Sequence, residues 1–382
     1  MQFVDLNTFY NPRGGGIRTY HEAKFDWFRR HPEHQYLIVG PDVHESKEMI
    51  APNIEYWALP GIQAQEDPEG YRALIDLRPL IIRLDDMPDA IVEVGDPWWS
   101  SHLFTRLRKM GKLPNPLTFF FHSDPLRTYI DPWSKRGAFQ PQRKLFARVI
   151  NRVFFRTFHR FDYIITSSKI MQEFLHEKHL KNVICMPFGA PQGCFDRFRI
   201  RTRKPGEPLK LLYAGRLQED KDIGLIAQSL DEILSDENVE LTVIGRGPES
   251  HHFTACKHPR LHYLGFVPER EKVEAIFDSH HALLAPGSWE TFGLSVLEAM
   301  AMGMPVIGPD RGGTWELLQQ LNSPLVFKTL DREAFVQQVQ KLSTLPLEEL
   351  SQEHHEVALR YGSWNDAMDR LMNFYLSKFG HH

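Results

Sequence analysis

The sequence predicts an α/β protein built from two doubly wound, Rossmann-like domains that face each other across a cleft. Its 382 residues are too many for a single hydrophobic core, since a domain usually takes about 100 to 200 residues. Short apolar runs rich in β-branched and aromatic residues alternate with helical patterns, which is typical of βαβ units and parallel sheets. A stretch rich in proline, glycine and basic residues, 189–208, interrupts this alternation and is interpreted as the interdomain linker.

The first domain is expected over residues 1–190. Its predicted strands are QFVDL (2–6), QYLIVGP (35–41), AIVEVG (90–95), LTFFFH (117–122), YIITSS (163–168) and VICMPF (183–188). In open α/β sheets ligands bind beyond the carboxyl ends of the strands, so the loops that follow these strands are where functional residues are expected.

The second domain is expected over residues 205–360. Its predicted strands are LKLLYAG (209–215), VELTVIG (239–245), LHYLGFV (261–267), HALLAP (281–286) and PVIGP (305–309), with helices at about 222–234, 270–279 and 293–302. The last segment, about 363–382, carries apolar residues at helical spacing. We expect it to form a helix that packs back on the first domain.

Composition excludes several classes of protein. Apolar residues make up 42% and charged residues 25%, which are ordinary globular values, and the net charge of −4 argues against a nucleic-acid partner. No signal-peptide pattern and no apolar run of about 18 residues is present, so no membrane span is expected. Three cysteines form neither a disulfide framework nor a zinc pattern, which favours the reducing cytoplasm.

Two loops carry residue types that suit phosphate. Three glycines, 14–16, follow the first strand and precede a helical pattern, so backbone amides there can approach an anion; a simple flexible turn is the alternative. The spacing is neither that of a dinucleotide fingerprint nor that of a P-loop. Arg216 and Lys221 follow the strand 209–215, where a guanidinium and an ammonium suit two adjoining phosphoryl groups, although two such residues alone are usually solvated surface.

A metal site is not expected. Asp220 and Asp222 form a DxD tripeptide, but Lys221 stands between the carboxylates and aspartates cap helix starts. The histidine pairs 251–252 and 280–281 lack the i, i+4 spacing of metal ligands and are interpreted as surface residues.

The segment SWETFGLSVLEAMAMGMPVIG, 288–308, is the strongest signal for function. Glu290 lies in a loop before a predicted helix, and Glu298 lies about two turns into it. A carboxylate accepts hydrogen bonds from vicinal hydroxyls, so Glu290 suits a pyranose and Glu298 a ribose, with the amides of the intervening helix start directed at phosphate. Taken alone, Glu298 would be read as a surface helical residue.

The chain resembles the retaining glycosyltransferases of family 4, which have the GT-B fold. The resemblance rests on the amino-terminal glycine loop together with GRLQEDK (215–221), VIGRGPE (243–249), YLGFVP (263–268), the segment 288–308 and SWNDAMDRL (363–371). These motifs cover nearly the full length in order and are more specific in the second domain. Two positions depart from the family: PFGAP (187–191) replaces its usual Pro-Asn-Gly, and Asp222 replaces a common glycine.

The resemblance implies roles for individual residues. It assigns Glu290 to the donor sugar, Glu298 to the ribose, and Arg216 with Lys221 to the departing diphosphate. His122, after the strand 117–122, is implied to lie beside the donor sugar. The remaining implied donor-binding residues are Gly15 and Gly16 near the diphosphate, Gly245 and Phe266 near the base, and Thr291, Phe292, Gly293 and Leu294 at the helix start.

The implied activity is metal-independent, retaining transfer of a hexose from a UDP- or GDP-sugar, with no further cofactor. The first domain would bind a glycan, lipid or small-molecule acceptor and the second the donor, with His122, Arg216, Lys221 and Glu290 as catalytic residues. Two alternatives stay open: a GT-B nucleotide-sugar epimerase, and a non-catalytic protein that binds nucleotide sugars.

Residues 143–160 indicate a membrane contact as one alternative. Arginines recur every fourth position on one helical face, and apolar residues cover much of the other. A stripe of like charges favours an anionic neighbour, either an acidic lipid surface at the inner face of the cell membrane or the protein's own carboxylates. The arginines are Arg148, Arg152, Arg156 and Arg160, and the apolar residues are Val149, Ile150, Val153, Phe154 and Phe158.

Overall fold

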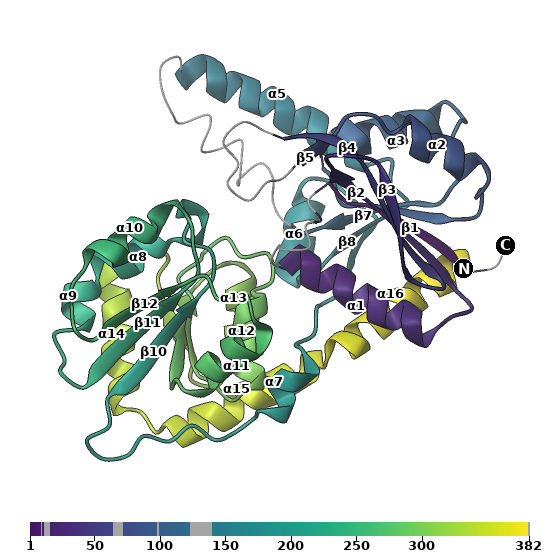
Figure 1. The fold of residues 1–382 in the computed structure, drawn as a ribbon. Helices are drawn as coiled ribbons and strands as arrows, with labels where there is room; N and C mark the ends of the chain where they lie inside the picture. The colour runs from purple at the N-terminus through teal and green to yellow at the C-terminus, as the bar shows by residue number, and fades with distance from the viewer. Residues whose placement is uncertain (9, 11–15, 64–71, 98, 123–139, 381–382) are drawn as a thin grey trace. The chain divides into compact units, whose positions relative to one another are not determined.

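The computed structural model describes residues 1–8, 10, 16–63, 72–97, 99–122 and 140–380 (Figure 1). The chain divides into two compact units. The first unit comprises Met1–Met186 and Asn365–His382, and the second comprises Pro187–Trp364. The two ends of the chain therefore belong to the same unit.

The first unit is built on a mixed sheet with the strand order β3-β4-β2-β1-β6-β7-β8-β9, and β5 pairs with β4. All its pairings are parallel except those that β3 and β5 make with β4. Its strands are β1 (Gln2–Leu6), β2 (Gln35–Asp42), β3 (Ser46–Ala51), β4 (Ile54–Gln63), β5 (Arg72–Leu74), β6 (Ile91–Val94), β7 (Leu117–Phe121), β8 (Tyr163–Thr166) and β9 (Val183–Cys185).

Helices cover both faces of this sheet, as its alternating side chains require. Figure 1 shows α1 and α16 on one face and α2 and α3 on the other. In β1, Val4 and Leu6 join the core under α2 and α3, whereas Phe3 packs against Phe28 of α1 and Tyr375 of α16. The helices are α1 (Gly16–Arg30), α2 (Arg78–Asp85), α3 (Trp99–Lys109), α5 (Gln140–Phe158), α6 (Lys169–Glu177) and α16 (Trp364–Phe379).

The second unit is built on a six-stranded sheet with the order β12-β11-β10-β13-β14-β15, parallel throughout. The central strands β13 and β14 are short and fully buried, as strands covered on both faces are, whereas the edge strand β12 is partly exposed. The strands are β10 (Leu209–Ala214), β11 (Val239–Ile244), β12 (Leu261–Gly265), β13 (Ala282–Leu284), β14 (Val306–Pro309) and β15 (Leu325–Phe327).

Short helices connect these strands. The segment predicted as one helix at 222–234 is broken at Ser229 into two, because its hydroxyl donates back to the carbonyl of Leu225 and competes with helix continuation. The stretch interpreted as a linker contains α7 (Gln192–Asp196). The other helices are α8 (Ile223–Gln228), α9 (Leu230–Ile233), α10 (His251–Ala255), α11 (Arg270–Asp278), α12 (Leu294–Ala301), α13 (Gly312–Leu318), α14 (Arg332–Thr344) and α15 (Leu347–Tyr361).

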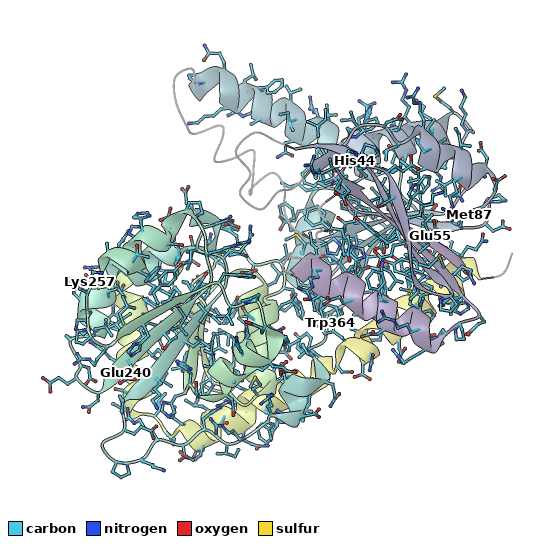
Figure 2. The ribbon with its side chains drawn as sticks, viewed as in Figure 1. His44, Glu55, Met87, Glu240, Lys257 and Trp364 are labelled. Atoms are coloured by element: carbon cyan, nitrogen blue, oxygen red, sulfur yellow. The ribbon has the colours of Figure 1, made fainter. Side chains whose placement is uncertain are left out.

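The second unit closes where its first and last residues meet. Ala190 and Ser363 form a parallel bridge, and Trp364, labelled in Figure 2, packs its ring on Phe188 with centroids 4.9 Å apart. Across the described residues, no helix is long and apolar enough to span a membrane.

A buried ionic network joins the centre of the first sheet to α1 and α16. The ammonium of Lys24 donates to Asp5 at 2.8 Å and to Glu93 at 2.6 Å, and all three side chains are almost fully buried. Tyr20 of α1 donates to Glu93 at 2.8 Å, and Tyr375 of α16 donates to the same carboxylate. One buried cation thus compensates two buried carboxylates, and α16 supplies a further hydrogen bond to Glu93.

Replacing Lys24 by methionine is expected to lower the free energy of unfolding by about 3 to 5 kcal/mol, because two carboxylates would be left buried without their cation. Denaturant unfolding of the full chain measures this. Lys112→Met, at an exposed position, is the matched control and should leave the midpoint unchanged. Equal midpoints for the two variants would contradict the structural role of the network.

Candidate functional site

The strand order of the second sheet reverses between β10 and β13. From β10 the chain moves outward through β11 and β12, then returns to add β13, β14 and β15 on the opposite side. Loops at such a reversal diverge and leave room for a ligand beyond the carboxyl ends of the strands. The loop after β10 carries Arg216 and Lys221, and the loop after β13 carries Glu290.

Lys221 and Glu290 meet at this reversal. The ammonium donates to the carboxylate at 2.7 Å, and both side chains are partly buried, at 20% and 28% exposure. Lys221 is the last residue of a single 3₁₀ turn, η2 (Glu219–Lys221), which is the next element after β10. The structure therefore brings together a cation and a carboxylate that the sequence only indicated were on neighbouring loops.

Arg216 lies in the same loop and points along it. Its guanidinium donates to Gln218 at 2.7 Å and to Asp220 at 3.3 Å, and about half of the side chain is exposed. The hydroxyl of Tyr213, at the end of β10, donates to the Arg216 carbonyl at 2.7 Å and fixes the backbone of the turn. Asp220 is thus engaged by an arginine of its own loop.

Two glycines of α13 support the Glu290 loop. The N–H of Gly313 donates to the Glu290 carbonyl at 2.6 Å. A Cβ at Gly313 would lie 2.4 Å from the Cα of Phe292, and one at Gly312 would lie 2.8 Å from the Ser288 carbonyl. The sequence interpretation did not include these residues, although the Gly-Gly pair after a strand was a visible signal of close backbone approach.

The start of α12 places the residues predicted around the donor phosphate. Gly293 has a φ of +90°, a conformation that only glycine adopts without strain, and it precedes the first helical residue, Leu294. The ring of Phe292 is buried against Phe188 and Tyr361. Only the backbone of Phe292 is therefore available to a ligand at the helix start. Thr291 and Leu294 are partly exposed beside it. A helix N-terminus of this kind attracts anions.

Glu298 is held by an arginine that the sequence interpretation missed. Arg270 of α11 donates to Glu298 at 3.0 Å and to Glu274 at 2.9 Å, and the Glu298 side chain is 14% exposed. Burial raises the pKa of Glu298, and the neighbouring guanidinium opposes that rise. Glu298 is therefore not an ordinary surface residue of a helix.

The residues predicted near the base follow two neighbouring strands, Gly245 after β11 and Phe266 after β12. Gly245 has a φ of +132°, and a Cβ there would overlap the Gly215 carbonyl at 1.8 Å, so the loop after β11 packs directly on the Arg216 loop. Phe266 exposes about half of its surface, and the guanidinium of Arg246 lies 4.7 Å from its ring centroid. An exposed aromatic ring suits stacking of a base.

Two predicted residues lie in the first unit. His122 follows β7, and its ring stacks on Phe120 at 4.4 Å and contacts Tyr20 edge-on at 4.8 Å. Burial lowers the pKa of His122 to about 3, so the imidazole is neutral at neutral pH. Gly16 is the first residue of α1, whereas Gly15 lies outside the described residues.

A group of metal-ligand side chains occurs away from the DxD tripeptide. Glu249, His251 and His252 offer ligand atoms within 4.8 Å of one another, which makes this the one such group in the described part of the chain. Of these, His252 pairs with Glu249 at 2.9 Å. The carboxylates of Asp220 and Asp222 do not belong to it.

The helix α5 buries only some of the apolar residues that the sequence placed opposite its arginines. Phe154 and Phe158 are buried and Ile150 is partly buried, but Val149 and Val153 each expose about half of their surface. Leu145 and Phe146, one turn earlier, are also exposed, next to the exposed Arg148 and Arg152. Val149 and Val153 therefore lie outside the covered side of the helix, unlike Phe154 and Phe158. Arg160 lies beyond the end of α5.

The sequence is similar to known glycosyltransferases. The family described as "Glycosyl transferases group 1" matches residues 208–344, which span the second sheet and its site loops. A relative with 27% identity over 322 residues is the "GDP-mannose-dependent alpha-(1-6)-phosphatidylinositol dimannoside mannosyltransferase" of Mycobacterium tuberculosis, with 80% of this chain and 79% of that protein covered. The protein is a glycosyltransferase.

Further similarities agree with the GT-B fold. The sucrose-phosphate synthase of Thermosynechococcus elongatus aligns with a TM-score of 0.73 at 16% identity over the full length of both chains. The trehalose-6-phosphate enzyme of E. coli, solved with UDP-2-fluoro glucose, aligns at 0.70 and 13% identity over 100% and 99% of the two chains. The predicted resemblance to family 4 and the fold of two parallel-sheet α/β domains are confirmed.

In this glycosyltransferase the close packing under the Glu290 loop is open to test. Gly313→Ala is expected to lower the free energy of unfolding by about 1 to 3 kcal/mol and to weaken nucleotide-sugar binding, because the added methyl must displace the backbone of Phe292. Calorimetric titration and denaturant unfolding measure the two effects. Gly224→Ala is the control, since its Cβ would meet nothing nearer than 3.9 Å inside α8; a Gly313→Ala protein that matches this control would refute the packing argument.

Proposed function

We propose that the protein is a retaining glycosyltransferase that moves a hexose from a nucleoside diphosphate sugar to a glycan, lipid or small-molecule acceptor without a metal ion. The observation that carries the proposal is the ion pair between Lys221 and Glu290 at the reversal of strand order. Its cation suits a departing diphosphate, and its carboxylate suits sugar hydroxyls. Glu298 lies in α12, the helix that follows the Glu290 loop, and supplies a second carboxylate that can bind the hydroxyls of a ribose.

The transfer step breaks the bond between the anomeric carbon and the diphosphate oxygen and forms a bond from that carbon to the acceptor oxygen on the same face. The acceptor proton passes to the leaving phosphate oxygen, so no covalent enzyme intermediate is required. Negative charge grows on the diphosphate as the sugar becomes oxocarbenium-like. Arg216, Lys221 and the N-terminus of α12 supply a preorganised positive potential for that charge.

His122 is proposed to lie beside the donor sugar near the reacting carbon. Because burial lowers its pKa to about 3, the imidazole acts there as a neutral hydrogen-bonding group. A neutral ring adds no positive charge next to a carbon that itself becomes positive during transfer. This role follows the family resemblance and the buried environment of the ring against Tyr20 and Phe120.

GDP-mannose is the donor to test first. The M. tuberculosis relative is named as GDP-mannose-dependent. So is a "GDP-mannose-dependent alpha-mannosyltransferase" of Corynebacterium glutamicum, which is 27% identical over 119 residues, covering 31% of this chain and 27% of that protein. Thermal-shift measurements with UDP, GDP and ADP and their sugars would identify the base. A product assay with the stabilising sugar would then identify the acceptor class.

The same measurements separate the alternatives. An epimerase would convert or hydrolyse the nucleotide sugar in the absence of any acceptor. A non-catalytic binding protein would be stabilised by a nucleotide sugar and would give no product with any acceptor. The complete set of Arg216, Lys221, Glu290 and Glu298 favours the transferase over a binding protein, because all four residues that the family resemblance assigns to the donor are present.

Lys221→Ala and Glu290→Gln are each expected to lower kcat by about 10²- to 10³-fold, the effect of removing one preorganised charge or hydrogen bond at developing charge. The measurement is the steady-state rate of nucleotide release with saturating acceptor. Thermal melting should change little, because both side chains lie at the rim of the sheet. Lys272→Ala, at an exposed position of α11 away from these loops, is the control; near-normal transfer by either site variant would defeat the assignment.

A lipid-linked acceptor would bring the enzyme to a membrane surface, and α5 offers a suitable face. Leu145, Phe146, Val149 and Val153 are 51% to 61% exposed and lie beside exposed arginines of the same helix. Apolar side chains flanked by basic residues match an anionic lipid surface. We therefore propose that this face contacts the membrane that presents the acceptor.

Replacing both Val149 and Val153 by glutamate is expected to weaken binding to anionic phospholipid vesicles about tenfold or more, because apolar burial is lost and charge repulsion is added. Vesicle co-sedimentation at low salt measures this. Ile82→Glu alters an equally exposed apolar residue on α2 and should leave binding unchanged. If the unmodified protein does not sediment with these vesicles, the membrane contact is excluded.

A further inference from the structure

Asp222 connects the two loops of the site through its side chain. It follows Lys221 directly and stands where the family often has glycine. Its carboxylate accepts hydrogen bonds from the backbone N–H of Ser288 at 2.8 Å and from the Ser288 hydroxyl at 2.5 Å. Ser288 is buried and lies two residues before Glu290.

The backbone of Asp222 explains why glycine is common here. Its φ and ψ are +49° and +29°, the left-handed region that glycine enters without cost and that aspartate tolerates better than most residues. The chain needs this conformation because η2 ends at Lys221 and α8 begins at Ile223, so a single residue must redirect the backbone. A glycine would satisfy the turn but could not reach Ser288.

The Asp222 carboxylate therefore adds an interaction with Ser288 that the left-handed turn does not require. It ties the loop after β10 to the loop after β13 through two hydrogen bonds that span 66 positions of sequence. The ion pair between Lys221 and Glu290 joins the same two loops. Lys221 is the residue before Asp222, and Glu290 is the second residue after Ser288. On its other side, the Glu290 loop rests on Gly312 and Gly313.

We propose that Asp222 is a positioning residue that holds the loops of Lys221 and Glu290 at a fixed separation, so that cation and carboxylate meet the diphosphate and the sugar of one donor molecule. The inference rests on the proposed function, since it assumes that this pair serves transfer. Misplacing a catalytic group by about 1 Å can cost about a hundredfold in rate, so a two-bond tie beside the pair bears on turnover.

The groups around Asp222 determine how the tie responds to pH. Lys221 and Asp220 come from its own loop, Tyr213 from β10, and Ser288 from the facing loop, where Glu290 is bound to Lys221. Burial raises the pKa of Asp222 above the ordinary value for aspartate, partly opposed by the Ser288 hydrogen bonds. The carboxylate accepts both hydrogen bonds when ionised. The tie is therefore strongest above that raised pKa and weakens as pH falls through it.

Two substitutions of Asp222, by glycine and by asparagine, distinguish the role of its left-handed backbone from the role of its hydrogen bonds to Ser288. Asp222→Gly keeps the left-handed turn and removes both hydrogen bonds; kcat is expected to fall about tenfold or more, the effect of one charge-assisted hydrogen bond, with less than a threefold change in donor KM. Asp222→Asn keeps a carbonyl acceptor and should retain more activity than the glycine variant. It should also lose the acid limb of the kcat profile that ionisation of Asp222 gives the unmodified enzyme.

Ser288→Ala tests whether Asp222 acts through its hydrogen bond with the Ser288 hydroxyl. If the two residues act through one contact, the double variant Asp222→Asn with Ser288→Ala should be no slower than the slower single variant, whereas independent effects would multiply. Multiplying effects would overturn the proposal, as would full kcat in Asp222→Gly.

A second aspartate of this domain provides a matched control. Asp310, after β14, accepts from the backbone N–H of Thr329 at 2.9 Å and from its hydroxyl at 2.6 Å, which is the same pair of bonds without contact to Lys221 or Glu290. Asp310→Asn and Thr329→Ala should leave kcat and its pH profile unchanged. Equal losses of kcat and melting temperature in the Asp222 and Asp310 variants would reduce Asp222 to a structural role and overturn the proposal.

Failure of the proposed function would give a different result. If Lys221→Ala and Glu290→Gln retain transfer, the assignment of the donor site is wrong whatever the Asp222 variants do. If those two lose transfer while Asp222→Gly keeps it, the donor site stands and the positioning role of Asp222 is wrong.

Discussion

The ion pair between Lys221 and Glu290 depends on a constraint of parallel sheets: the carboxyl ends of all strands lie at one edge. The two residues are 69 positions apart, and they meet because β10 and β13 are neighbours at the reversal of strand order. The other loops of the site issue from the same edge. Gly245 packs on the Arg216 loop, and Gly313 packs on the Glu290 loop, so glycines set how closely the loops approach.

Each carboxylate of the site has its own partner. Glu290 pairs with Lys221, Glu298 with Arg270 and Asp220 with Arg216, and Asp222 binds Ser288. Partly buried carboxylates need such partners because desolvation disfavours their charge. The pairing also orients each group before a ligand arrives, which is how fixed charges stabilise a transition state without reorganising during the reaction.

The first unit depends on a comparable buried interaction at its centre. Lys24 compensates Asp5 and Glu93, and Tyr20 and Tyr375 complete the hydrogen bonds of Glu93. Tyr20 also contacts the ring of His122, so the network borders the residue of this unit that the resemblance implies to be catalytic. Because Tyr375 belongs to α16, the last residues of the chain are part of the environment of its first strand.

The sequence alone determined the alternation of strands and helices, and with it the two-domain α/β fold, because apolar periodicity and turn residues are local properties. It also indicated Arg216, Lys221, Glu290 and Glu298, through their combination on loops that follow two strands and through the resemblance to a known family, since each residue type alone is common on protein surfaces. Only the tertiary structure decided which partners these residues have. Arg270 reaches Glu298, and Asp222 reaches Ser288, through side chains far apart in sequence that strand order brings together. The left-handed conformation of Asp222 likewise follows from the junction of η2 with α8, which no local pattern specified.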